Sequence, residues 1–217
     1  MKCGQPRKPL YALLICLVAA SATSAQRRMV LIDQDGSGPG GSNQMTMMVL
    51  LRSPQARVLG ITIVTGNAWR DDEVQHTQRM LELIGRTDVP VVPGAVFPLI
   101  RTQEETRLAA QLDGKVTWLG SWVQGPVNPV QTPHGVVGVA PERPDLHGPW
   151  DVPAPPEGAP HTKPLEEDAA HFLIRQIRAH PHQVTVDAAG PLTNIALAID
   201  PHLAELAQGI VIMGGAG

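Results

Sequence analysis

Hydrophobic residues in this chain form two alternating patterns. Short β-branched runs end at acidic, glycine or small polar residues, which is typical of buried strands. Longer segments carry apolar residues at the helical period, with polar residues between them. The first pattern predicts strands over residues 29–33, 58–64, 89–92, 184–188 and 210–213. The second predicts helices over residues 43–52, 70–84, 165–177, 192–199 and 203–208.

Strands that alternate with helices predict an α/β fold. Because the strands are rich in Val and Ile, we expect a mostly parallel, Rossmann-like open sheet with helices on both faces. The pattern fits a single domain over residues 29–217. Residues 96–163 interrupt it, and proline is frequent beyond Pro126. Such a length of weakly patterned chain predicts a lid or a mobile insertion.

Residues 1–25 have the composition of a bacterial export signal. Three basic residues precede an apolar stretch over residues 10–20, and small residues suitable for cleavage follow it. The other interpretation is a buried N-terminal helix. A signal peptide implies a periplasmic or secreted protein, and both cysteines, Cys3 and Cys16, lie within it. The mature chain would then have no disulfide.

Charge narrows the range of partners. Removing residues 1–25 takes away three basic residues and no acid, so the formal net charge goes from -3 to -6. An acidic chain without a basic run is a poor nucleic-acid binder. We therefore expect a small-molecule ligand, no nucleic acid and, after cleavage of the signal, no membrane association. Assembly into a homo-oligomer is compatible with this composition.

The clearest candidate chemistry is a pair of carboxylates at the end of the first predicted strand. Asp33 and Asp35 are two residues apart, so in extended chain they point to the same side. Paired hard oxygen donors suit Ca²⁺ or Mg²⁺, and their proximity raises one pKa, which suits proton transfer. Alternatively, both residues cap the glycine turn that follows. That turn, residues 36–41, lacks the signature of a P-loop.

Three further strand ends carry candidate residues. Asn67 follows the second strand and either binds sugar hydroxyls or closes its own turn. Ala189 precedes a glycine that permits close backbone approach, so its carbonyl can point into a crevice. Met213 ends the last strand, where it either packs against a sugar or belongs to the core. Asn194, in the turn after Ala189, is expected to bond to local backbone.

His147 is the most interesting histidine of the long insertion. It is followed within three residues by Trp150. A lid that brings an imidazole and an indole over a planar ligand is one interpretation. An exposed loop histidine is the other.

Two blocks of sequence carry a resemblance to a known family. Residues 59–67 read LGITIVTGN, and residues 184–216 combine a strand, the turn GPLTNIA, a helix and the segment VIMGGA. These blocks resemble the inosine-uridine preferring nucleoside hydrolase family. The resemblance implies the nucleoside hydrolase fold and hydrolysis of the N-glycosidic bond of ribonucleosides by water on a bound Ca²⁺.

The resemblance also implies roles for individual residues. Asp35 matches a metal ligand and general base, and Asp33 its supporting partner. Ala189 matches a position that gives a backbone carbonyl to the metal. Asn67 and Met213 match positions that contact the ribose.

The sequence departs from the family pattern in two places. Asn43 and Gln44 stand where the family has a pair of aspartates that bind metal and ribose, so Asn43 becomes a candidate substrate contact. The segments that complete the family's sugar and metal sites are not found, so we expect the C-terminal part of the fold to be missing. These departures leave a second hypothesis, a catalytically degraded nucleoside- or sugar-binding protein of the same fold.

Overall fold

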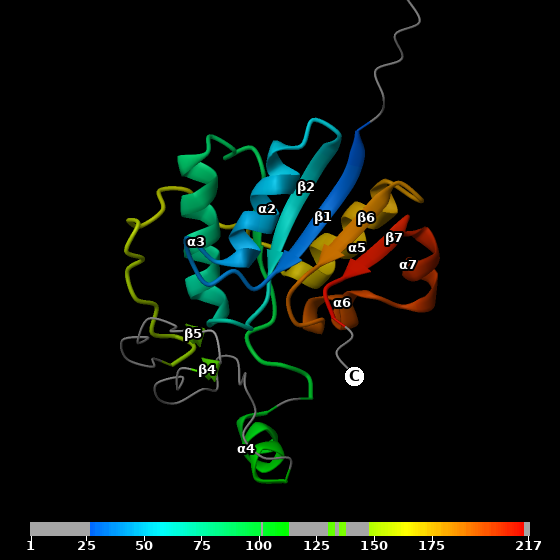
Figure 1. The fold of residues 1–217 in the computed structure, drawn as a ribbon. Coiled ribbons are helices and arrows are strands. Elements are labelled where there is room, and N and C mark those ends of the chain that lie inside the picture. The colour runs from blue at the N-terminus through cyan, green and yellow to red at the C-terminus, as the bar shows by residue number, and fades with distance from the viewer. Residues whose placement is uncertain (1–26, 101, 113–129, 133–134, 138–147, 215–217) are drawn as a thin grey trace, which may run out of the picture.

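A parallel sheet forms the centre of the molecule. The computed structural model describes residues 27–100, 102–112, 130–132, 135–137 and 148–214 (Figure 1). The sheet has five strands in the order β3-β2-β1-β6-β7, and every neighbouring pair is parallel. The strands are β1 (Arg28–Gln34), β2 (Ala56–Ile63), β3 (Val91–Pro93), β6 (Val184–Ala188) and β7 (Gly209–Ile212). The predicted α/β fold with a parallel open sheet is confirmed.

Helices cover both faces of this sheet (Figure 1). On one face, α2 (Ser42–Arg52) and α3 (Arg70–Leu83) pack with β1, β2 and β3 around Ile32 and Ile61. On the other face lie α5 (Ala169–Ala179), α6 (Thr193–Ala198) and α7 (Pro201–Leu206), which enclose a second core around Leu31 and Phe172. Successive β1 residues thus alternate between two cores, as the period of an extended strand requires.

Two helix starts differ from the prediction. Helix α2 begins at Ser42 instead of Asn43, and its N-cap is Gly41, which has no side chain to make a capping bond. Helix α5 begins at Ala169, capped by the Asp168 side chain, which accepts a hydrogen bond from the backbone N–H of His171. Leu165 precedes this helix because its backbone N–H donates to the carbonyl of Val91 and extends the β3 edge.

The insertion contains some regular structure of its own. It includes α4 (Gln103–Leu112) and an antiparallel hairpin of β4 (Val130–Thr132) and β5 (Gly135–Val137). Its C-terminal part runs beside α3. The predicted signal peptide, residues 1–25, and His147 lie outside the described residues. None of the helices that the structure describes is both long and apolar enough to cross a membrane.

The order of the strands predicts where a ligand binds. From β1 the chain passes through α2 to β2 on one side, whereas β6 pairs with β1 on the other side. Open α/β sheets bind ligands where the connections diverge in this way, outside the carboxyl ends of the strands. Asp33 to Asp35 at the end of β1 and Ala189 after β6 lie at this position.

Strand β7 forms one edge of the sheet among the described residues. Val211 is 57% exposed, Ile212 51% and Met213 68%. An apolar edge strand of this kind invites pairing with another chain.

Candidate functional site

Asp33 lies fully buried at the carboxyl end of β1. Its Oδ1 accepts hydrogen bonds from Thr62 Oγ1 at 2.5 Å and from Asn194 Nδ2 at 2.8 Å. Its other carboxylate oxygen, Oδ2, has no hydrogen-bond partner among the described residues. Burial raises the pKa of Asp33 to about 6, although both hydrogen bonds oppose the shift. Asp33 therefore has a free oxygen and a charge that the protein does not neutralise.

Asp35 is held two residues further on by two asparagines. Its Oδ1 accepts a hydrogen bond from Asn43 Nδ2 at 2.5 Å, and its Oδ2 accepts one from the backbone N–H of Asn67 at 3.2 Å. The Asn67 side chain donates to the Asp35 carbonyl at 2.9 Å. Burial raises the pKa of Asp35 to about 7, hydrogen bonds lower it, and the charge of Asp33 raises it further. The two carboxylates therefore interact, as their spacing predicted.

Two glycines let the backbone approach Asp35 closely. A Cβ atom added to Gly66 would lie 2.2 Å from Asp35 Oδ2. A Cβ added to Gly190 would lie 3.1 Å from the Asp35 backbone nitrogen and 3.2 Å from its Cβ. A side chain at position 66 would displace the carboxylate. The turns after β2 and β6 thus converge on Asp35, and the turn after β2 leaves no room for a side chain at position 66.

Asn194 joins three parts of the sheet, contrary to the expectation that it bonds to local backbone. Its Nδ2 donates to Asp33, and its Oδ1 accepts from the backbone N–H of Ala95 at 2.8 Å. Gly94 leaves room for the amide, since an added Cβ would lie 2.2 Å from Asn194 Oδ1. The side chain is fully buried, so both hydrogen bonds are shielded from water.

Sequence reasoning did not identify Thr62 as part of the site. It faces Asp33 directly in the β1–β2 register. The available signal was a single hydroxyl within the apolar run of β2, since a buried polar group needs a partner.

The other predicted site residues also lie at the carboxyl ends of the strands. Ala189 is next to Asp33, because its backbone N–H donates to the Asp33 carbonyl at 3.0 Å. The backbone N–H of Met213 donates to the Ala188 carbonyl at 3.0 Å, and its exposed side chain is not part of the core. Asp33, Asp35, Asn43, Asn67 and Ala189 are thus brought together, with Met213 beside them.

Asn43 turns its amide nitrogen toward the carboxylate. Besides bonding to Asp35, Nδ2 donates to Gln34 Oε1 at 2.9 Å, while Oδ1 accepts from Ser42 Oγ at 3.3 Å. Gln44 points into the interior, and its Nε2 has no hydrogen-bond partner among the described residues. Neither amide offers an oxygen to the Asp33–Asp35 pair.

The donor set fits a divalent cation. Two buried carboxylates with raised pKa values and an unpartnered oxygen on Asp33 form a site short of positive charge. Hard oxygen ligands of this kind suit Ca²⁺. Within the described residues no group of three or more His, Cys, Asp or Glu side chains could hold a metal. A cation here would therefore need backbone, water or ligand oxygens in addition to the two carboxylates.

One pocket lies at the other end of the strands. It is lined by Arg28, Gln183, Thr185 and Gln208, near the amino ends of β1 and β6. None of these four residues is acidic. We therefore place the candidate site at the carboxyl ends, where the buried carboxylates are.

Known proteins resemble the chain over nearly all of its described length. A family model described as inosine-uridine preferring nucleoside hydrolase matches residues 30–217. Uridine nucleosidase 1 of Arabidopsis thaliana is 31% identical over 189 residues, which cover 86% of this chain and 45% of the relative. Pyrimidine-specific ribonucleoside hydrolase RihA of Citrobacter koseri is 32% identical over 86% of this chain and 48% of the relative.

Solved structures agree with the sequence matches. The plant nucleoside hydrolase PpNRh1 superposes with a TM-score of 0.57 at 27% identity, over 87% of this chain and 48% of that one. An inosine-guanosine nucleoside hydrolase gives a TM-score of 0.54 at 25% identity, also over 87% and 48%. The chain spans about half the length of the relatives it matches. It belongs to the inosine-uridine preferring nucleoside hydrolase family.

Proposed function

We propose that the protein hydrolyses the N-glycosidic bond of ribonucleosides and releases a free base and ribose. The observation that carries this proposal is Asp35, a buried carboxylate that Asn43 and Asn67 hold at the carboxyl ends of the strands. A general base must be held where it can reach the proton it accepts. The relatives named above are a uridine nucleosidase and a ribonucleoside hydrolase, which supports the same class of reaction.

Asp35 is the general base in this proposal. Its Oδ1 and Oδ2 are fixed by Asn43 and Asn67, so the carboxylate can take a proton from water without first reorienting. Such preorganisation removes part of the entropic barrier to reaction. Glycosidic hydrolysis passes through an oxocarbenium-like transition state, whose positive charge a nearby carboxylate also stabilises.

Calcium is the proposed cofactor. Asp33, Asp35 and the carbonyl of Ala189 are the residues that would hold it, and the free Oδ2 of Asp33 supports this assignment. When bound, the ion supplies a positive charge that orients sugar hydroxyls and lowers the pKa of water. Asn67 and Met213 are the proposed contacts to the ribose, and Asn43 lies near enough to Asp35 to join them.

The test is release of free base from inosine and uridine, measured by chromatography with and without Ca²⁺. Asp35→Asn should lower kcat at least 100-fold, because an amide cannot accept the proton. Asp88→Asn is the matched control, since Asp88 is exposed and pairs with Arg86 in the loop before β3, far along the chain from Asp35. Turnover by Asp35→Asn at the rate of the control would exclude Asp35 as the base.

A second candidate function is binding without hydrolysis. It is favoured by Asn43, whose side-chain amide donates a hydrogen bond to Asp35 and adds no negative charge to the site. A site with fewer anionic ligands holds Ca²⁺ more weakly. Calorimetry would separate the two functions: nucleoside binding without Ca²⁺ binding or turnover would establish the second.

We further propose that the protein is exported through a signal peptide over residues 1–25. Fractionation of a bacterial host that expresses the chain tests this proposal. Mass spectrometry should find a mature N-terminus near residue 26 outside the cytoplasm. An intact N-terminus in the cytoplasmic fraction would reject the proposal.

A further inference from the structure

The outward face of α3 holds one irregular segment of the insertion. We call residues 153–162 the strap. Five polar side chains on this helix face contact it, at positions that lie on neighbouring turns. They are Gln75, His76, Gln78, Arg79 and Glu82.

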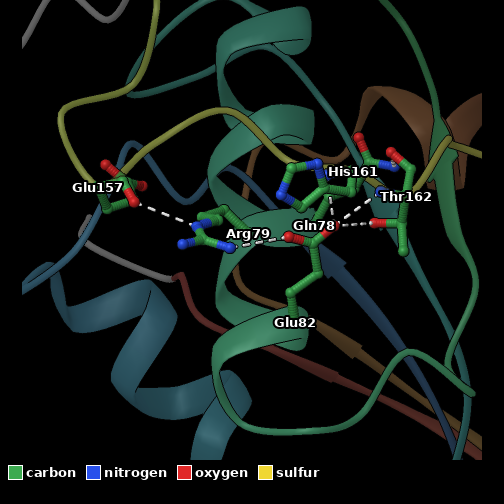
Figure 2. A network of polar contacts seen from close by, with 6 residues as sticks. All are labelled: Gln78, Arg79, Glu82, Glu157, His161 and Thr162. Carbon is green, nitrogen blue, oxygen red and sulfur yellow. Dashed lines mark hydrogen bonds and ion pairs between the residues drawn. The ribbon is translucent and has the colours of Figure 1, made fainter.

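Glu82 makes the largest number of these contacts (Figure 2). Its Oε1 accepts hydrogen bonds from the backbone N–H groups of His161 and Thr162, at 2.6 and 2.7 Å, and from Thr162 Oγ1 at 3.0 Å. Its Oε2 pairs with Arg79 Nη1 at 3.0 Å. These hydrogen bonds, with that from Thr162 the largest, lower the pKa of Glu82 to about 2. Glu82 therefore stays ionised and able to accept them at any physiological pH.

The remaining contacts are donated to carbonyl groups of the strap. Gln78 Nε2 donates to the Thr162 carbonyl at 2.9 Å, and Arg79 Nε donates to the Glu157 carbonyl at 3.1 Å (Figure 2). Gln75 Nε2 reaches the Pro153 carbonyl at 3.4 Å. The strap is thus bound along its whole length by side chains of one helix.

The strap has little buried surface of its own. Pro155 is its only buried residue. It carries four prolines, at 153, 155, 156 and 160, which cannot donate backbone hydrogen bonds. Its own backbone closes one turn, in which the Gly158 N–H donates to the Pro155 carbonyl at 2.9 Å. The polar face of α3 therefore supplies the larger share of the hydrogen bonds that hold the strap.

The strap connects to an aromatic row that reaches the turn after β2. Just before it, a turn closed by the hydrogen bond from Asp151 N–H to the Gly148 carbonyl carries Trp150. The Trp150 ring packs edge-on against Phe97, with centroids 6.2 Å apart. Phe97 packs in the same way against Trp69, which lies two residues after Asn67.

A second link runs from the strap to the loop after Asp35. The Nδ1 atom of His76 contacts Glu157 Oε1. The same imidazole lies against Gly38, where an added Cβ would be 3.3 Å from its Cε1. The α3 face thus touches the glycine loop on one side and the strap on the other.

We propose that Glu82 and Arg79 are positioning residues: by fixing the strap on α3 they set the place of Trp150 in the aromatic row that reaches the turn after β2. Such a row offers planar ligands a surface for stacking. The proposal rests on the proposed function only for its kinetic consequence. Its structural part can be measured without any turnover.

The structural part is tested with a Glu-specific protease on the full chain. Cleavage between Glu157 and Gly158, followed by mass spectrometry, should be at least tenfold faster in Glu82→Ala than in wild type. Glu82→Gln keeps an acceptor oxygen for His161 and Thr162 and should stay within threefold of wild type. The matched control is Glu205→Ala, an exposed residue of α7, which should cleave at the wild-type rate.

Arg79→Met provides a second variant in case Glu82→Ala does not fold, with thermal melting as the check on folding. Wild-type cleavage rates in the folded variants would overturn the proposal. In protein that hydrolyses inosine or uridine, Glu82→Ala should raise KM at least fivefold with kcat within twofold. Faster cleavage with unchanged KM would show that the strap is anchored by Glu82 but does not position the site, which also overturns the proposal. Absence of hydrolysis in wild type would reject the proposed function and leave the cleavage result to decide the structural part.

Discussion

Asn194 donates a hydrogen bond of 2.8 Å to Asp33, although the two residues are 161 positions apart in the sequence. The bond connects the first turn of α6 to the end of β1, and the insertion lies between these two elements in the sequence. The same amide accepts from the N–H of Ala95 after β3. One buried side chain therefore fixes three strand ends relative to one another.

Replacing Asn194 by Ala should destabilise the fold. It takes the partner from the part-buried Ala95 N–H and removes a hydrogen bond from the buried Asp33, a loss of about 2–4 kcal/mol in the free energy of unfolding. Urea denaturation followed by circular dichroism measures this change. Leu197→Ala is the control, because Leu197 is an exposed residue of the same helix. Equal stability of the two variants would contradict the role of Asn194 in holding these strand ends together.

Replacing Gly66 by Ala should weaken the site while the rest of the sheet is kept. The new Cβ would collide with Asp35 Oδ2, and the carboxylate must move. We expect Ca²⁺ affinity, measured by calorimetry, and the rate of base release to fall at least tenfold. Gly209→Ala is the matched control, since an added Cβ there meets nothing within 4 Å. Wild-type values for Gly66→Ala would show that the position of Asp35 is not restricted by this turn.

The two site carboxylates should make the metal-free protein less stable as the pH rises. Folding raises the pKa of Asp33 to about 6 and that of Asp35 to about 7. A carboxyl group whose pKa is raised on folding stabilises the native state below its ordinary value of 3.8. That contribution is lost as the pH rises through the folded value, by about 1.4 kcal/mol per pKa unit for a buried group.

Thermal melts in EDTA between pH 4 and pH 8 check this expectation. Asp35→Asn should melt above wild type at pH 8 and close to it at pH 4, because the amide never ionises. Adding Ca²⁺ in place of EDTA should raise the melting temperature of wild type at pH 8. The melting temperature of Asp35→Asn should change little. A difference in melting temperature between wild type and Asp35→Asn that does not vary with pH would contradict the raised pKa of Asp35.

The exposed edge strand should make the chain associate. Val211 and Ile212 on β7 offer apolar surface and unpaired backbone among the described residues. Light scattering after size exclusion should show a mass that rises with protein concentration, and Val211→Lys should reduce it, because an edge lysine opposes strand pairing. Val49→Lys, on the exposed side of α2, is the control. A monomer at all concentrations would contradict this prediction.

Local pattern was sufficient for the five strands of the sheet, for the approximate positions of most helices and for several residues of the site. Strand periodicity placed Asp33 and Asp35 on one side of the chain, and the strand ends identified Asn67 and Ala189. The local pattern did not predict contacts between residues that are far apart in the sequence. Nothing near Asn194 in the sequence indicates that its amide reaches Asp33, and nothing near Thr62 indicates its partner except an isolated hydroxyl in an apolar strand.

The class of fold, the family and the two acidic residues can be predicted from the sequence, because these depend on hydrophobic period and on motifs of consecutive residues. Three other features become evident in the folded molecule: Asn43 donates to Asp35, Gly66 leaves room for the carboxylate, and the strap is bound to α3. Each of these depends on the distance between atoms that chain connectivity leaves free and that packing of the sheet and helices fixes. The burial that raises the pKa of Asp35 toward neutrality is a result of that packing too.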